Sequence, residues 1–197
     1  MHKTISLLFF LFAVSLRAQS PATFSFNING PAPVGFEAYL KKGAERWANH
    51  LLITVPVKVN VFIINTPLIP FSGLTLANGV KNFPNAPEQN ISYVTALANQ
   101  IAGTELNPGQ YDMDIYFNLN SSFYYGDGNP PFNQIDFITL AMHEIGHGLG
   151  FYSTAYVDAN GLGSFGNIPS SAISPISTSF PWPGQLNVPT IYDKHIL

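Results

Sequence analysis

The chain has 197 residues, of which 46% are hydrophobic and 14% aromatic, and it contains no cysteine. This length and composition favour one folded domain and exclude an intrinsically disordered protein. A formal net charge of −3 leaves no basic footprint for nucleic acid. The lack of cysteine excludes disulfides and thiolate metal sites, so any metal must bind His, Asp, Glu or water.

Residues 1–18 have the pattern of a secretory signal peptide. His2 and Lys3 precede an apolar run from Ile5 to Leu16. The run is shorter than the roughly 20 apolar residues that span a bilayer, which disfavours an N-terminal membrane anchor. We therefore expect a protein that is secreted to the extracellular space or the periplasm, with residues 19–197 as one catalytic domain and no membrane span after the leader is removed.

The first half of the mature chain shows three periodic segments. Residues 24–28 alternate apolar and polar side chains like a half-buried strand, and residues 35–52 place apolar side chains at helical spacing. Residues 55–64 alternate over a β-branched stretch, which predicts a strand. Proline, glycine and asparagine then crowd residues 67–89, which predicts a long surface loop.

The second half begins with a short helix over residues 91–101, closed by Gly103, and continues with a strand over 111–118. Helical spacing resumes over residues 133–150. Beyond Phe151 no periodic segment persists, and such a tail is unusual in a compact domain. The tail is either a functional loop, or the chain is truncated before the elements that would pack it.

These elements predict an α+β fold. A small twisted mixed sheet would contain the strands near residue 24, at 55–64 and at 111–118. Helix 35–52 would back this sheet, and helix 133–150 would be the active-site helix. A zinc ion would lie in a cleft between the sheet edge and residues 151–197.

Residues 143–147 read H-E-I-G-H, which matches the H-E-x-x-H pattern within the last predicted helix. Imidazoles at i and i+4 lie on one helix face, so His143 and His147 can bind one zinc ion together. Glu144 can then accept a proton from zinc-bound water as the water attacks a carbonyl group. We interpret Asp136, at the start of this helix, as an acid that complements the helix dipole.

The alternative interpretation of the pattern is a coincidental pair of buried histidines. Three glycines argue against it, namely Gly146, Gly148 and Gly150. Each weakens a helix by about 1 kcal/mol relative to alanine, so they need a reason other than helix formation. A metal site is therefore favoured.

The segment from His143 to Phe151 resembles the metzincin pattern H-E-x-x-H-x-x-G-x-x-H. This resemblance implies a metzincin or zincin-like fold, Zn²⁺ as cofactor, His143 and His147 as ligands and Glu144 as general base. The chain departs from the pattern at Ser153, a poor zinc ligand in the place of the third histidine. Secreted bacterial metzincin-like proteins are also similar to this chain at residues 96–98, 114–118, 122–126 and 191–197.

The third zinc ligand must therefore come from elsewhere, since catalytic zinc sites normally use three protein ligands. We predict Asp193, ahead of His195 and Asp158, because apolar residues precede Asp193 and can anchor the tail. The alternative is that Asp193 orients His143 or His147 through a ring N–H.

The resemblance also implies a strand that pairs with the substrate backbone. Residues 112–118 are best placed in sequence for this role, with Asp114, Ile115 and Tyr116 as substrate-binding residues. An ordinary core strand is an equally open interpretation.

The leading hypothesis is a secreted zinc metalloendopeptidase that hydrolyses peptide bonds of a protein or peptide substrate. The second hypothesis is a catalytically impaired, metal-containing secreted binding module on the same fold. Ser153 motivates the second hypothesis, because it replaces a metal ligand.

Overall fold

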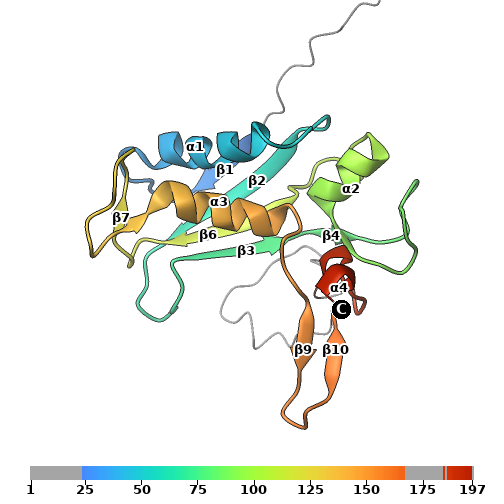
Figure 1. Cartoon of the computed structure of the whole chain (residues 1–197). Coiled ribbons are helices and arrows are strands. Elements are labelled where there is room, and N and C mark those ends of the chain that lie inside the picture. Colours follow the sequence, from blue (N-terminus) through green and yellow to red (C-terminus); the bar gives the residue numbers. More distant parts are fainter. Residues whose placement is uncertain (1–23, 167–183, 185, 197) are drawn as a thin grey trace, which may run out of the picture.

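The computed structural model of the chain describes residues 24–166, 184 and 186–196 (Figure 1). The predicted signal peptide, residues 1–18, lies outside the described residues. The helices are α1 (Phe36–Ala48), α2 (Thr95–Ala102), α3 (Phe137–Gly148) and α4 (Ile191–Ile196). The strands are β1 (Phe24–Asn29), β2 (Val57–Ile64), β3 (Gly73–Ala77), β4 (Gly79–Val80), β5 (Tyr93–Val94), β6 (Met113–Asn118), β7 (Phe123–Tyr124), β8 (Ile135–Asp136), β9 (Ala155–Val157) and β10 (Gly163–Phe165).

A four-stranded sheet with the order β1-β2-β6-β3 forms the centre of the fold. β1, β2 and β6 are parallel, and β3 is antiparallel to β6. α1 joins β1 to β2, as expected because parallel neighbours need a crossover connection. The short strands pair separately, as β4 with β5, β7 with β8 and β9 with β10.

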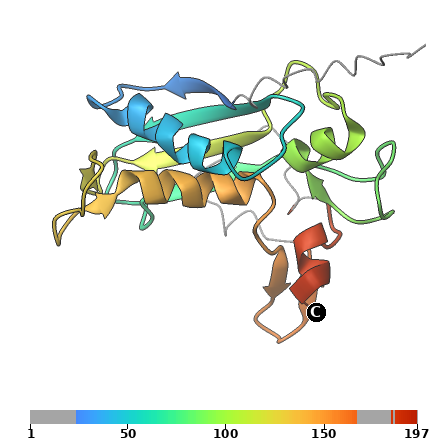
Figure 2. The same cartoon turned by 45° about the horizontal axis from the view of Figure 1, so that its top comes forward.

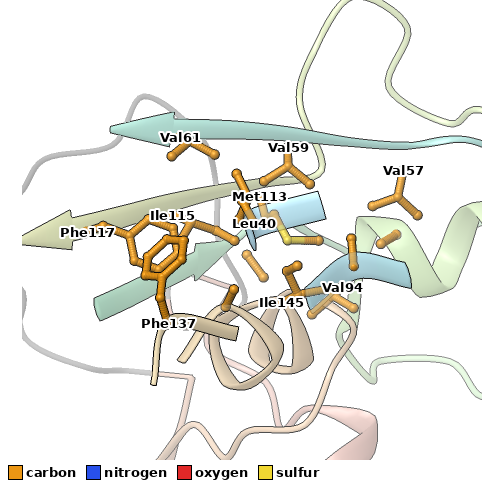
Figure 3. Close-up of a cluster of buried hydrophobic side chains, with 14 of the residues drawn as sticks. Leu40, Val57, Val59, Val61, Val94, Met113, Ile115, Phe117, Phe137 and Ile145 are labelled. Atoms are coloured by element: carbon orange, nitrogen blue, oxygen red, sulfur yellow. The ribbon is translucent and has the colours of Figure 1, made fainter. Parts of the chain in front are cut away.

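The main core lies between this sheet and two helices. Val57, Val59 and Val61 of β2 are at most 1% exposed. Figure 3 shows these valines on the side of the sheet where Phe137 and Ile145 of α3 pack. The alternation in the sequence therefore gives β2 one face that is buried beneath the helices.

α1 and α3 lie side by side on the buried face of the sheet (Figure 2). Glycine permits their close approach, since a Cβ atom on Gly43 would lie only 2.8 Å from the Cβ of Ala141. Among the residues that the structure describes, no helix is long and apolar enough to cross a membrane.

The predicted α+β class is confirmed, as are the three predicted sheet strands and the two covering helices. The prediction of one long loop over residues 67–89 is wrong, because β3 and β4 lie there. β3 is held by pairing with β6, a contact distant in sequence that local composition does not indicate. The described part of the tail is also more regular than expected, since it contains β9, β10 and α4.

Candidate functional site

α3 carries the H-E-x-x-H residues and begins later than the predicted helix 133–150. The Asp136 carboxylate accepts hydrogen bonds from the backbone N–H groups of Ile138 and Thr139. Asp136 is therefore the N-cap residue, which satisfies two of the free N–H groups at the start of a helix. This capping explains the start of α3 at Phe137 and the position of the H-E-x-x-H residues in its last turns.

α3 ends in a Schellman motif. Gly150 has a φ of 111°, and its N–H donates to the carbonyl of His147, while the N–H of Phe151 donates to the carbonyl of Gly146. These two bonds close the helix at a residue with positive φ, a conformation that glycine adopts readily. The motif directs the chain from α3 back toward His147.

The other two glycines of the motif region have packing roles. A Cβ atom on Gly146 would lie 3.1 Å from the Trp47 indole, and one on Gly148 would lie 2.0 Å from the sulfur of Met113. Packing thus explains Gly146 and Gly148, and helix termination explains Gly150, so these glycines do not by themselves favour a metal site. Support for such a site must come from the histidines themselves.

The imidazoles of His143 and His147 converge on the exposed side of α3. Their Nε2 atoms are 3.0 Å apart, and the ring centroids are 4.4 Å apart. Nδ1 of His147 is 2.9 Å from the carbonyl oxygen of Phe151. A carbonyl can only accept, so Nδ1 carries the proton in this contact, and in the neutral imidazole the lone pair is on Nε2, which faces Nε2 of His143.

Glu144 lies beside the histidines but is only 3% exposed. Its carboxylate packs under β3, where the hydroxyl of Thr75 lies 2.8 Å from Oε2 and 2.9 Å from the backbone carbonyl of Glu144. A Cβ atom on Gly73 would lie 2.5 Å from Oε1, so glycine makes room for the carboxylate. Burial raises the pKa of Glu144, while the Thr75 hydrogen bond and the two histidines act in the opposite direction.

The edge of the sheet next to Glu144 is β3. β6 pairs with β2 on one side and with β3 on the other, so both of its backbone edges are occupied. This corrects the expectation that Asp114, Ile115 and Tyr116 pair with a substrate backbone, because these residues lie within β6. The edge strand of the four-stranded sheet on this side is β3.

Asp193, predicted as the third zinc ligand, is completely buried. Its carboxylate accepts hydrogen bonds from the backbone N–H and hydroxyl of Thr154 and from the N–H of Thr190. The N–H of Asp193 in turn donates to the Thr190 hydroxyl at 3.1 Å, which forms a capping box at the start of α4. Burial raises the pKa of Asp193, but hydrogen bonds, including one from Ser153, outweigh it and leave this pKa below its usual value.

This placement does not agree with a ligand role for Asp193, because zinc would have to displace the donors that hold its carboxylate. His195 lies on α4 and lines an apolar cavity of about 340 Å³. Asp158 accepts from the N–H groups of Asn160 and Leu162 in the β9–β10 turn. Within residues 24–166, 184 and 186–196, the structure brings no three His, Cys, Asp or Glu side chains together as a metal-binding group.

Sequence reasoning missed Thr75 and Gly73, which contact Glu144, and the Phe151 carbonyl, which contacts His147. No local pattern indicated Thr75 or Gly73, since their roles depend on long-range strand pairing. The capping box at Thr190 and Asp193 did have a sequence signal, a threonine followed three residues later by an acid.

Comparison with known proteins gives a partial match. Residues 88–166, which include the H-E-x-x-H segment, match the family described as SPBPB7E8-like. The uncharacterized protein PB7E8.01 of Schizosaccharomyces pombe is 31% identical over 108 residues, which cover 52% of this chain. The chain spans 18% of the length of that relative. No solved structure matches.

These findings correct the assignment to the metzincins. The matching family is the SPBPB7E8-like family, and no metzincin family matches. The described residues also lack the three-donor metal group that the metzincin pattern would provide. The chain departs from the metzincin pattern at Ser153, the position where that pattern has its third histidine.

Proposed function

We propose that this chain is a secreted zinc-dependent peptidase of the H-E-x-x-H type, independent of the metzincin family. His143 and His147 would hold the metal, and Glu144 would act as the general base. The observation that carries the proposal is the convergence of the two Nε2 atoms, 3.0 Å apart, beside a buried carboxylate. Secretion rests on the leader pattern of residues 1–18.

The spacing of the two imidazoles supports their role as two of the ligands of a zinc ion. Nitrogen ligands lie about 2.0–2.1 Å from zinc, so two ligands at a tetrahedral angle are separated by about 3.3 Å. The observed distance of 3.0 Å between the two Nε2 atoms is close to this separation. The hydrogen bond from Nδ1 of His147 to the Phe151 carbonyl also sets the tautomer that metal binding requires.

When bound, zinc would supply a Lewis acid that activates water and polarises the scissile carbonyl. Glu144 accepts the proton of the attacking water and returns it to the leaving nitrogen. Burial favours this role, because it raises the pKa of Glu144 and strengthens the carboxylate as a base. Thr75 orients the carboxylate by a hydrogen bond to Oε2.

Among the described residues no strand pairs with the outer edge of β3, and this edge provides a place for the substrate. A peptide in an extended conformation would add to this edge by backbone hydrogen bonds. Gly73 and Thr75 of β3 contact Glu144, so a peptide on this edge would lie next to the general base. The substrate class is therefore an extended protein or peptide segment.

Replacing Glu144 by glutamine tests the mechanism. Glu144→Gln keeps the side-chain volume and leaves both histidines in place, but an amide cannot accept the proton. We expect unchanged zinc content and a casein hydrolysis rate lowered by about 10²–10⁴-fold. Glu45→Gln, on the exposed side of α1, is the matched control and should cleave like wild type. Equal hydrolysis by Glu144→Gln and wild type would contradict the proposal.

A second candidate is a secreted metal-containing binding module without turnover. It is favoured by the absence, among the described residues, of a third donor beside His143 and His147. Zinc stoichiometry measured together with casein turnover distinguishes the two candidates. One tightly bound zinc per chain with no cleavage under any condition would favour the binding module.

A further inference from the structure

Residues 151–154 connect the end of α3 to the β9–β10 hairpin without regular secondary structure. Their conformation therefore depends on individual contacts. The Schellman bond holds the N–H of Phe151, and the Phe151 ring stacks on Trp47 with the centroids 5.4 Å apart. The remaining side of the segment is held by α4.

The hydrogen bonds from α4 to this segment come from its capping box. Asp193 Oδ2 is 2.9 Å from the Thr154 hydroxyl, and both carboxylate oxygens accept from the Thr154 N–H at 3.2 and 3.3 Å. The Thr190 hydroxyl lies 3.4 Å from the carbonyl oxygen of Tyr152. Two side chains, Asp193 and Thr190, thus join the start of α4 to the chain that follows α3, and Asp193 makes the shorter contacts.

We propose that Asp193 is a positioning residue for the metal site. It holds residues 151–154 so that the Phe151 carbonyl stays against Nδ1 of His147, which keeps Nε2 of that imidazole free to bind metal. The inference rests on the proposed function in so far as it assigns a metal to Nε2. The effect on the imidazole itself does not depend on any metal.

The physical basis is the charge and burial of the carboxylate. Hydrogen bonds to an ionised acceptor are roughly twice as strong as neutral ones. Asp193 is 0% exposed, so water cannot replace its partners when they move. Loss of the carboxylate would therefore leave the longer Thr190–Tyr152 contact to hold the segment on the α4 side, and the Phe151 carbonyl would be less well fixed.

The first test observes the imidazole in the full chain without metal. Long-range ¹H–¹⁵N NMR spectra report which ring nitrogen carries the proton. We expect the Nδ1–H tautomer of His147 in wild type and a mixture of tautomers in Asp193→Ala. Asp158→Ala is the matched control, since Asp158 also accepts backbone hydrogen bonds but does not contact Thr154.

The second test measures zinc affinity by competition with a chelator. Asp193→Ala should weaken zinc binding by about 10–100-fold, the range typical of groups that orient a ligand, and Asp158→Ala should not. If Asp193→Ala fails to fold, Thr154→Val removes one donor to the carboxylate and Thr154→Ser restores it. Thr154→Val should then weaken binding, and Thr154→Ser should bind like wild type.

Two results would overturn the positioning role. Unchanged tautomer and affinity in a folded Asp193→Ala would show that the segment does not need this carboxylate. An affinity loss far beyond 100-fold would make Asp193 a direct ligand. If wild type binds no zinc, the proposed function fails, while the tautomer measurement still decides whether Asp193 positions His147.

Discussion

The two parts of the molecule that surround His143 and His147 are stabilised in different ways. α3 is fixed by dense packing, with Phe137 completely buried among the aromatic rings of Phe36, Phe117 and Tyr125. In the described parts of the segment that follows, residues 151–166 and 186–196, directional hydrogen bonds contribute, and those of the completely buried Asp193 carboxylate join the two parts. The helix can therefore present its side chains rigidly, while the segment next to it can be altered by the loss of a single polar group.

Removing a ring from the packed region should give the largest effect. Phe137→Ala deletes a fully buried side chain and leaves a cavity, so we expect the free energy of unfolding to fall by about 3–5 kcal/mol. Phe165→Ala, in the partly buried strand β10, should cost about 1 kcal/mol. Urea unfolding of both variants measures the difference, and equal losses would show that the two regions are packed alike.

Asp112, the residue before β6, is an acidic side chain that is almost completely buried. It is 1% exposed, and burial raises its pKa to about 6, although the N–H of Lys58 donates to it. The folded chain then binds a proton more tightly than the unfolded chain does. This tighter proton binding adds up to about 3 kcal/mol to the free energy of unfolding below about pH 4, and the contribution is lost as the pH rises through 6.

Asp112→Asn should remove this pH-dependent contribution. The wild-type minus variant difference in unfolding free energy should therefore decrease between pH 4 and pH 7. Thermal unfolding at a series of pH values gives this difference directly. A difference that stays constant, or increases with pH, would contradict the raised pKa.

A smaller effect is expected where the helices touch. Gly43→Ala would place a methyl group 2.8 Å from the Cβ of Ala141, and overpacking of this kind costs about 1–3 kcal/mol. The better helix propensity of alanine offsets about 1 kcal/mol of this cost. Gly163→Ala, in the hairpin, meets no atom within 4 Å and should be nearly neutral. A Gly43→Ala variant as stable as Gly163→Ala would show that α1 can shift away from α3.

How much of the fold could be predicted from the sequence depended on whether the contacts that hold each element are local or distant in the sequence. The alternation of Val57, Val59 and Val61 and the i, i+4 spacing of His143 and His147 are local patterns, and the structure has the expected strand and helix. The strand β3 was missed because its hydrogen bonds come from a distant strand, so Thr75 could not be connected to Glu144.

Asp193 illustrates a different limit. Its sequence context contained the capping-box signal with Thr190, but a lone acid in an irregular tail was interpreted as a metal ligand. Only the fold shows that its carboxylate is used by Thr154, which lies 39 positions away in the sequence. Local patterns thus predicted the helix that carries the histidines, but not the contacts that orient them.

Zinc binding by the full chain tests the central claim most directly. We expect wild type, after zinc addition and removal of excess metal, to retain one zinc per chain, with imidazole nitrogens in its X-ray absorption spectrum. His143→Ala and His147→Ala should each lose this zinc, because a single imidazole cannot hold the ion. His50→Ala, an exposed histidine just after α1, is the control and should retain it. Retention of zinc by the double variant lacking both His143 and His147 would contradict the account.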